Sequence, residues 1–367
     1  MTANTSSIID ERFGSAERFR TLRGIRQEAQ CRLSAEQWNF LHSGTGDETT
    51  LARNTRAFDE ILWNTPLFAG VSSPNTGSRL FGHELSLPLL VAPFGGDAEF
   101  HPEGHLAAGR AAQRTGIMQM VPVASSFTLE EVAASSQCPK LFQMTLVGEV
   151  SACVELADRA RQAGYERIVA TYSPLRQWRE RLMEDAFVPR VSMQRNFSEG
   201  GTAAQRATLE ELVSFTAPRW SWQQVQSFIR ECDLPVMVKG VQSPRDAEAA
   251  LAAGADSLYV SNYGGRTVDR TPASIEVLPE VRAAAGPEVP IVLDSGIRRG
   301  SDIAAALALG ADAVAAGRLI ALGLAAAGEE GVVRTVELLR DELWTTLGHL
   351  GCSSVEELSS EVLYCRP

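Results

Sequence analysis

Histidine is scarce in this sequence of 367 residues, which contains five of them and none between His105 and His349. The six cysteines are scattered without any paired spacing, so they predict free thiols in a reducing cytoplasm and no metal site or disulfide scaffold. No stretch approaches the roughly 20 uninterrupted apolar residues of a membrane helix. The opening segment MTANTSSIIDERFG is acidic and lacks an apolar core, which excludes a secretory signal. These absences predict a cytoplasmic protein without a membrane partner.

The composition is that of a soluble globular protein, with 44% hydrophobic and 22% charged residues and a mean hydropathy of −0.07. It excludes a disordered or collagen-like chain. The 34 basic and 45 acidic residues give a net charge of −11, which argues against nucleic acid as the main partner. The length allows one large domain or two ordinary ones.

Short apolar runs alternate with helical segments through most of the chain. Most runs are continuously hydrophobic, as expected of parallel strands that are covered on both faces. They predict eight strands, at residues 89–95, 118–124, 141–146, 167–173, 234–240, 257–262, 290–296 and 313–317. Eight strands with interleaved helices indicate an α/β fold, the (β/α)8 TIM barrel. A doubly wound sheet is the alternative, but the GxGxxG turn typical of it is absent.

The pattern predicts one domain, residues 1–367, in three parts. Residues 1–87 are expected to form an N-terminal helical cap, whose residues 10–60 we expect over the bottom of the barrel, and residues 88–318 are expected to form the barrel. A mobile loop is expected at about 180–219, after the fourth strand, on the face where barrel enzymes keep their active sites. Residues 319–367 are expected to form C-terminal helices.

Charged residues follow several predicted strands. The seventh ends in LDSGIRRGSD and the eighth in AAGR, and glycines with arginines at adjacent strand ends favour phosphate binding over a surface charge cluster. The fifth strand ends at Lys239, and the sixth ends in SNYGGRTVD. Arg176 and Arg181 are expected on a solvated helix face.

These motifs carry a resemblance to a known family. LPLLVAPFGGDAEFHPEGHLAAGRAA, LPVMVKGV, SNYGGRTVD, LDSGIRRGSDIAAALALGADAVAAGR and RDELWTTLGHLGC resemble segments of the FMN-dependent α-hydroxy-acid oxidases and dehydrogenases. That family includes glycolate oxidase, lactate oxidase and mandelate dehydrogenase, and the similarity runs from about residue 40 to 358. The resemblance implies a (β/α)8 barrel that holds FMN, a small carboxylate substrate, O2 or a soluble electron acceptor, and a homotetramer.

The flavin half of the family's site is intact. The resemblance implies that Lys239 supports the negative charge of the reduced flavin, that Gln143 contacts its ring, and that Ala92 and Pro93 lie beside it. The residues that it assigns to the ribityl chain and phosphate are Asp294, Gly296, Arg298, Gly317 and Arg318.

The substrate half is only partly kept. Arg266 and Arg179 match the arginines that pair with the substrate carboxylate. The family's catalytic histidine falls on Tyr263, and the aspartate that orients it falls on Tyr172. Its two active-site tyrosines fall on Phe40 and Thr145. Together with Ala124, the smaller residues predict a roomier pocket and a bulky or aromatic substrate.

The loss of the histidine changes the expected chemistry. An unperturbed tyrosine is disfavoured as a base at neutral pH by about 5 kcal/mol relative to histidine. Arg266 and Lys239 could lower the pKa of Tyr263, and His42 is the nearest alternative base. Three hypotheses follow. The first is an oxidoreductase of specialised biosynthesis with a non-standard reaction, such as oxidation or oxidative decarboxylation, on an α-hydroxy or α-amino acid. The others are a flavin-dependent isomerase without net redox change and a silent FMN-binding scaffold.

Overall fold

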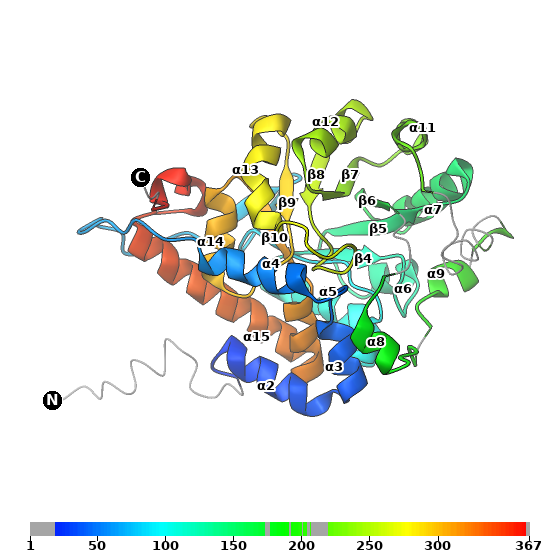
Figure 1. Cartoon of the computed structure of the whole chain (residues 1–367), viewed down its shortest axis with the longest axis horizontal. Helices are drawn as coiled ribbons and strands as arrows, with labels where there is room; N and C mark the ends of the chain where they lie inside the picture. Colours follow the sequence, from blue (N-terminus) through cyan, green and yellow to red (C-terminus); the bar gives the residue numbers. More distant parts are fainter. Residues whose placement is uncertain are drawn as a thin grey trace.

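The structure is a computed structural model that describes residues 19–172, 177–190, 192–199, 201–203, 206 and 219–364. Its centre is a closed parallel barrel of eight strands in the order β10-β3-β4-β5-β6-β7-β8-β9 (Figure 1). The strands are β3 Leu89–Val91, β4 Met118–Pro122, β5 Lys140–Leu146, β6 Arg167–Tyr172, β7 Val236–Val241, β8 Ser257–Val260, β9 Ile291–Leu293 and β10 Ala313–Ala316. Each overlaps a predicted strand, so the (β/α)8 barrel is confirmed.

Helices follow the strands and pack around the barrel. They are α5 Gly104–Thr115, α6 Leu129–Ala134, α7 Val150–Gln162, α11 Trp222–Glu231, α12 Pro244–Ala252, α13 Ser274–Ala285, α14 Gly300–Ala308 and α15 Arg318–Leu350. Several begin where a hydroxyl caps the first turn, as the side chain of Ser243 does by accepting from the amide of Asp246 at the start of α12. None of the helices in the described ranges combines the length and apolar character needed to cross a membrane.

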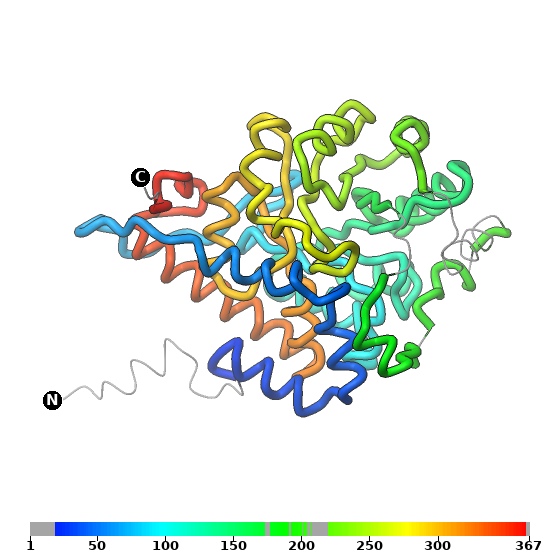
Figure 2. Tube along the Cα trace, viewed as in Figure 1, coloured from blue at the N-terminus to red at the C-terminus, as the bar shows by residue number. Residues whose placement is uncertain are grey.

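The last helix divides at Ala327 and Gly328, where the backbone angles are not helical. The chain after the barrel therefore forms two long helical pieces, followed by two 3-10 turns, η2 Val355–Glu357 and η3 Ser360–Val362. This agrees with the predicted C-terminal helices. The two pieces of α15 run beside α2 and α5 on one side of the barrel (Figures 1 and 2).

A hairpin closes the amino end of the barrel. It consists of β1 Ser78–Leu80 and β2 His83–Leu85, and its apolar side chains join the core inside the barrel. The guanidinium of Arg167, at the start of β6, lies 3.9 Å from the ring centroid of Phe81 at the hairpin turn. The neighbouring Glu166 accepts a hydrogen bond from His83 at 2.5 Å.

The N-terminal cap lies at the opposite end, so its predicted place over the bottom of the barrel was wrong. It contains α2 Leu22–Arg32, α3 Ala35–His42 and α4 Thr49–Asp59. The last carbonyls of α3 accept hydrogen bonds from arginines that follow strands β6, β8 and β10. Because the end of a helix leaves carbonyls without partners inside the helix, these cations hold α3 at the carboxyl ends of the strands.

The predicted loop at about 180–219 is described in part, and its described residues contain no strand. They include two short helices, α8 Glu180–Glu184 and α9 Arg195–Ser198. Helix α8 lies beside α3 (Figures 1 and 2). The ring of Phe187 stacks on Phe40 at a centroid distance of 4.7 Å. The described part of this loop therefore packs against the cap, and its mobility stays a prediction.

Candidate active site

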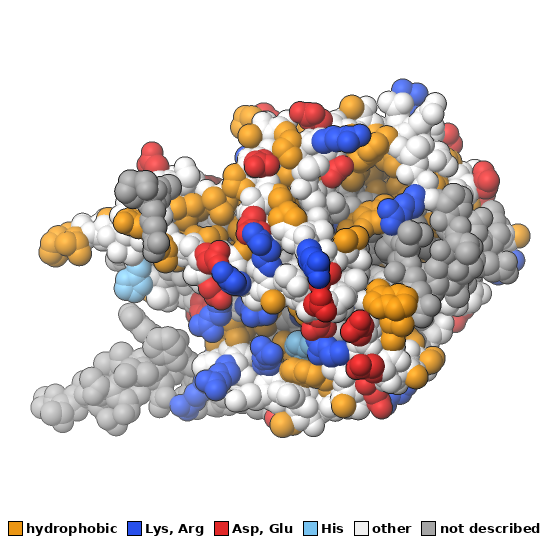
Figure 3. Space-filling view, in the orientation of Figure 1, with side chains coloured by type: hydrophobic (Ala, Val, Ile, Leu, Met, Phe, Trp, Pro, Cys, Tyr) orange, Lys and Arg blue, Asp and Glu red, His pale blue; other side chains and the backbone are white. Residues whose placement is uncertain are grey.

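A cavity of about 860 Å³ opens between the cap and the carboxyl ends of the strands. Its walls come from α2 and α3 on one side and from the segments after β3, β7, β8, β9 and β10 on the other. In the space-filling view, Lys and Arg side chains surround a hollow on this face (Figure 3). The cavity lies where (β/α)8 enzymes keep their active sites.

Lys239 lies buried at the floor of the cavity, on β7. Its ammonium donates to Asp294 at 2.6 Å and to the hydroxyl of Ser261 at 3.1 Å. It also lies 3.5 Å from the ring centroid of Tyr259, whose hydroxyl donates to the same carboxylate at 2.8 Å. Burial lowers the pKa of Lys239, while the charge of Asp294 opposes that shift. Lys239 is one of only two lysines among the 34 basic residues of the chain. A compact ammonium therefore lies at this position, although arginine is the usual cation of this chain.

The segments after β9 and β10 form a cradle for an anion. A Cβ atom added to Gly317 would meet only the Cβ of Ala92, at 3.6 Å, so this glycine faces open space. Helix α15 begins at the next residue with no side-chain cap on its first turn. Free amides at a helix start, with the guanidinium of Arg318 beside them, suit a phosphate. The residues present therefore fit the FMN that the family resemblance implies.

Gly296 has a different reason to be glycine. Its φ is +124°, and a Cβ there would lie 2.2 Å from the backbone oxygen of Asn54 in α4. The absent side chain makes room for the cap helix, although Gly296 also lines the cavity. Arg299, next to the predicted phosphate ligand Arg298, pairs with Glu342 of α15 at 2.8 Å.

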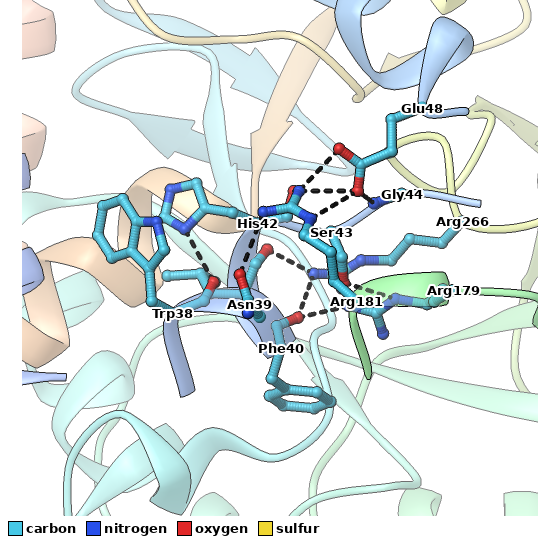
Figure 4. Close-up of polar contacts among 12 residues, drawn as sticks. Trp38, Asn39, Phe40, His42, Ser43, Gly44, Glu48, Arg179, Arg181 and Arg266 are labelled. Atoms are coloured by element: carbon cyan, nitrogen blue, oxygen red, sulfur yellow. Dashed lines mark hydrogen bonds and ion pairs between the residues drawn. The ribbon is translucent and has the colours of Figure 1, made fainter. Parts of the chain in front are cut away.

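Three arginines, of which Arg179 is buried and the other two are half-buried, converge on the end of α3 without any carboxylate partner among the described residues (Figure 4 shows two of them). Arg266 donates to the oxygens of Leu41 at 2.6 Å and Phe40 at 3.1 Å, while its buried Nε has no partner in the described part of the chain. Arg179 donates to Phe40 O at 2.5 Å and to the hydroxyl of Ser43 at 2.6 Å. The third is Arg318.

The electrostatics of these arginines point to a missing anion. Burial, followed by the charge of Arg318, lowers the pKa of Arg179 to about 9. Burial and Arg179 together lower the pKa of Arg266 well below its ordinary value. Desolvated cations that face only neutral carbonyls are costly unless an anion completes the site. The arrangement can bind a carboxylate or a phosphate.

Tyr263 projects into the cavity from a left-handed turn. Its φ is +58°, and Gly264 and Gly265 continue the turn at +67° and +75°. The hydroxyl donates to the backbone oxygen of Lys239 at 2.9 Å. It lies over Gly240, where a Cβ would be only 2.2 Å from the phenolic oxygen. The missing side chain at Gly240 therefore creates the space that the phenol occupies.

The pKa of Tyr263 moves in the direction opposite to the one expected from the nearby cations. Burial raises it well above 10, and the charges of Tyr172 and Asp294 act in the same direction. The ring of Tyr172 packs edge-on against Tyr263, with centroids 5.4 Å apart and an interplanar angle of 88°. The raised pKa and the bond to the oxygen of Lys239 therefore disfavour Tyr263 as a general base.

The cavity brings together most of the predicted site residues. Those that line it are Phe40, Ala92, Pro93, Lys239, Tyr263, Arg266, Asp294, Gly296, Arg298, Gly317 and Arg318. Tyr172 and Arg179 do not line the cavity, but they contact the lining residues Tyr263 and Phe40. Thr145 and Ala124 are not part of its wall, and Gln143 donates to the hydroxyl of Thr171 at 3.0 Å inside the barrel.

Two expectations about neighbouring arginines have different outcomes. Arg181 does not lie on a solvated helix face, because it lines the cavity and pairs with Glu48 at 2.7 Å. Arg176 lies outside the described residues. Sequence reasoning also missed the contribution of α2, where Arg23, Arg26 and Gln30 line the cavity. Their spacing along one face of a helix was the signal that could have found them.

Comparisons with known proteins agree with the geometry. The profile of the FMN-dependent dehydrogenase family matches residues 29–365. The chain is 36% identical to the 4-hydroxymandelate oxidase of Amycolatopsis orientalis, covering 91% of this chain and 95% of that protein. It is 35% identical to the L-lactate oxidase of Lysinibacillus sphaericus, covering 90% and 89%. The crystal structure of a mandelate oxidase with benzoyl-formic acid superposes with a TM-score of 0.84 at 34% identity, covering 94% of this chain and 98% of that one.

Proposed function

The chain belongs to the family of FMN-dependent dehydrogenases, and we propose that this FMN-dependent oxidoreductase oxidises an aromatic α-amino acid, using dioxygen as the electron acceptor. The observation that carries the proposal is the state of Tyr263. This residue stands where the family has its base, yet its hydroxyl donates to the oxygen of Lys239 and its pKa is raised. The site therefore suits a substrate whose oxidation needs no general base from the protein.

Two groups of residues would hold the cofactor, one at its ring and ribityl chain and one at its phosphate. Lys239, Asp294, Ala92 and Pro93 are proposed for the ring and ribityl region, and Arg298, Arg318 and the amides beginning at Gly317 for the phosphate. FMN, when bound, supplies an acceptor for two electrons and a proton. The ammonium of Lys239 would place positive charge where the reduced cofactor becomes negative, and Asp294 and Tyr259 keep that ammonium in position.

The substrate carboxylate would bind Arg266. Arg266 bonds the described residues through Nη2, and its buried Nε has no acceptor among them. A carboxylate at Nε would supply the missing acceptor and the missing negative charge together. Arg179 lies behind Phe40 and strengthens the positive potential at the same place. We propose the aromatic class of substrate because Phe40 and Phe100 line the cavity, and because relatives of this chain are mandelate oxidases.

The amine explains how the reaction proceeds without a base. Oxidation of an α-hydroxy acid removes a hydride from carbon and a proton from a hydroxyl group that holds it tightly. A neutral amine already has a free lone pair, which becomes the second bond to carbon as the hydride leaves. The product is a cationic imino acid that keeps both nitrogen-bound hydrogens, and water then converts it to a keto acid and ammonium. Tyr263 would only accept a hydrogen bond from the amine, through a lone pair that its own donation leaves available.

Anaerobic mixing of the purified holoenzyme with matched aromatic α-amino and α-hydroxy acids tests the proposal. We expect the amino acids to bleach the flavin absorbance, with a rate that increases with pH until the amine is deprotonated. Bleaching by hydroxy acids alone would overturn the amine assignment. Turnover without bleaching would indicate an isomerase, and a lack of any response would favour a scaffold. Dioxygen uptake in air, with release of hydrogen peroxide, tests the electron acceptor.

A further inference from the structure

His42 is a cavity residue that the flavin and substrate assignments do not use. It is the last residue of α3, and its imidazole stacks on Trp38 with centroids 3.8 Å apart. Its Nδ1 lies 3.2 Å from the backbone oxygen of Trp38. Because a carbonyl can only accept, Nδ1 carries the hydrogen of the neutral ring, and Nε2 is a lone pair without a protein partner among the described residues.

Arginines hold the backbone on both sides of His42. Arg318 donates to the oxygens of Leu41 at 3.1 Å and Ser43 at 3.4 Å. Arg181 donates to the oxygen of His42 itself at 3.1 Å (Figure 4). These contacts place the imidazole on the same wall of the cavity as the guanidinium at the start of α15. The position of His42 is therefore fixed by the groups that form the anion cradle.

The surroundings of His42 contain many more cations than anions. The charged groups that face it from the packed elements are Arg26 of α2, Arg179 and Arg181 near α8, Arg266 after β8, Arg318 of α15, and Glu48 before α4. Arg298 lies beyond Arg26 and Arg318, with Asp302 and Asp59 next to it. Burial, together with Arg26, Arg318 and Arg266, lowers the pKa of His42 to about 3. The imidazole is therefore neutral while the cradle lacks an anion.

We propose that His42 is a ligand of the FMN phosphate, and that its Nε2 takes up a proton as the phosphate binds. A dianionic phosphate among Arg298, Arg318 and the first turn of α15 would cancel the repulsion that keeps the imidazole neutral. The protonated Nε2 would then donate a charge-assisted hydrogen bond to a phosphate oxygen. Binding that takes up a proton becomes stronger as the pH decreases. The inference rests on the proposed placement of the phosphate and is independent of the proposed substrate.

The test is the binding of FMN and of riboflavin to the flavin-free full-length protein. Quenching of flavin fluorescence gives the affinity, and calorimetry in buffers with different ionisation enthalpies gives the number of protons taken up. At pH 7 we expect His42→Gln to weaken FMN binding about 10-fold, the value of one charge-assisted hydrogen bond. Riboflavin, which lacks the phosphate, should bind both proteins equally. The wild type should take up more protons with FMN than the variant does.

Two controls keep the proposal open to refutation. His349→Gln changes an exposed histidine near the end of α15, remote from the cavity, and should bind FMN as the wild type does. Should the His42 variant fail to fold, the proton count of the wild type with FMN against riboflavin still decides the question. Equal proton counts for the two flavins, or equal weakening of both flavins by His42→Gln, would overturn the phosphate contact. Because no substrate is present, these results do not depend on the proposed reaction.

Discussion

Restoring the family's base to this pocket should create α-hydroxy-acid oxidation. The ordinary pKa of histidine is near 6.5, whereas burial raises the pKa of Tyr263 well above its ordinary 10. Relative to histidine, a tyrosine base is therefore disfavoured by at least about 5 kcal/mol when the proton is completely transferred. With the proton about half transferred in the transition state, we expect a gain of about 2.5 kcal/mol, or roughly 70-fold, in kcat/KM. Histidine also tolerates the left-handed φ of +58° at this position better than most residues.

The single substitution lacks the carboxylate that orients the imidazole. Tyr172 is the neighbour that could supply it, since its ring lies edge-on to Tyr263 at 5.4 Å. We expect the pair Tyr172→Asp and Tyr263→His to gain about 10-fold over the single variant, because the carboxylate fixes the tautomer of the imidazole and stabilises its protonated form. The gain should exceed the product of the two separate effects.

Dioxygen uptake with an aromatic α-hydroxy acid measures the gain, and anaerobic flavin reduction isolates the chemical step. Tyr263→Phe is the matched control, since it removes the hydroxyl and introduces no base. It should lower amino-acid oxidation about 10-fold, the value of one hydrogen bond in a dry site, and should not create hydroxy-acid oxidation. If the double variant binds FMN and oxidises no hydroxy acid, the absence of a base is not what limits this pocket, and the reasoning fails.

Other substitutions test separate parts of the site. Arg266→Leu should raise the substrate KM at least 100-fold in initial-rate measurements, because the donors for the substrate carboxylate are lost together with the bonds to the oxygens of Phe40 and Leu41; an unchanged KM would remove Arg266 from the substrate site. Gly240→Ala should lower the free energy of unfolding in urea by about 2 kcal/mol or more, since its Cβ would lie 2.2 Å from the oxygen of Tyr263. Adding Tyr263→Phe should recover about 1 kcal/mol, and strict additivity would contradict the contact. Burial raises the pKa of Asp302 to about 6, so its stabilising effect is complete below its unfolded pKa near 4 and lost as the pH rises through about 6. Between pH 4 and 7, the free energy of unfolding of the flavin-free wild type should decrease by about 2 kcal/mol more than that of Asp302→Asn, as denaturation in urea measures. An equal change in the two proteins would refute the raised pKa of Asp302.

The strands of the barrel were predictable because each is encoded locally. Strand β9, Ile291–Leu293, is a continuous apolar run that ends at the polar Asp294, and both features are visible without any partner. The position of the cap depends on contacts that the sequence does not reveal. Arg318 bonds the oxygen of Leu41 across 277 residues. A polar-faced helix indicates which side meets water, but not which end of the barrel it covers.

The chemical state of Tyr263 shows the same limit at the level of one side chain. The motif SNYGGRTVD identified the substitution, and the cations near it in the sequence were a reason why its pKa could be lowered. In the structure the phenol lies over Gly240 and bonds the oxygen of Lys239, so burial governs its pKa and the direction is reversed. A motif shows which charged residues lie near a group in the sequence. The direction of the group's pKa shift also depends on whether the fold buries the group away from water.

The three arginines that bond α3 connect the binding of ligands in the cavity with the stability of the cap. Arg179, Arg266 and Arg318 donate to carbonyls of α3, and burial, reinforced by their mutual repulsion, lowers the pKa of each. Phosphate and carboxylate would relieve that repulsion without breaking the bonds to α3, because each guanidinium has five donors. A ligand that binds only the folded chain stabilises it in proportion to the logarithm of its concentration. FMN should therefore strengthen the attachment of α3 to the barrel, and the cap that completes the cavity is held most firmly when the cavity is full.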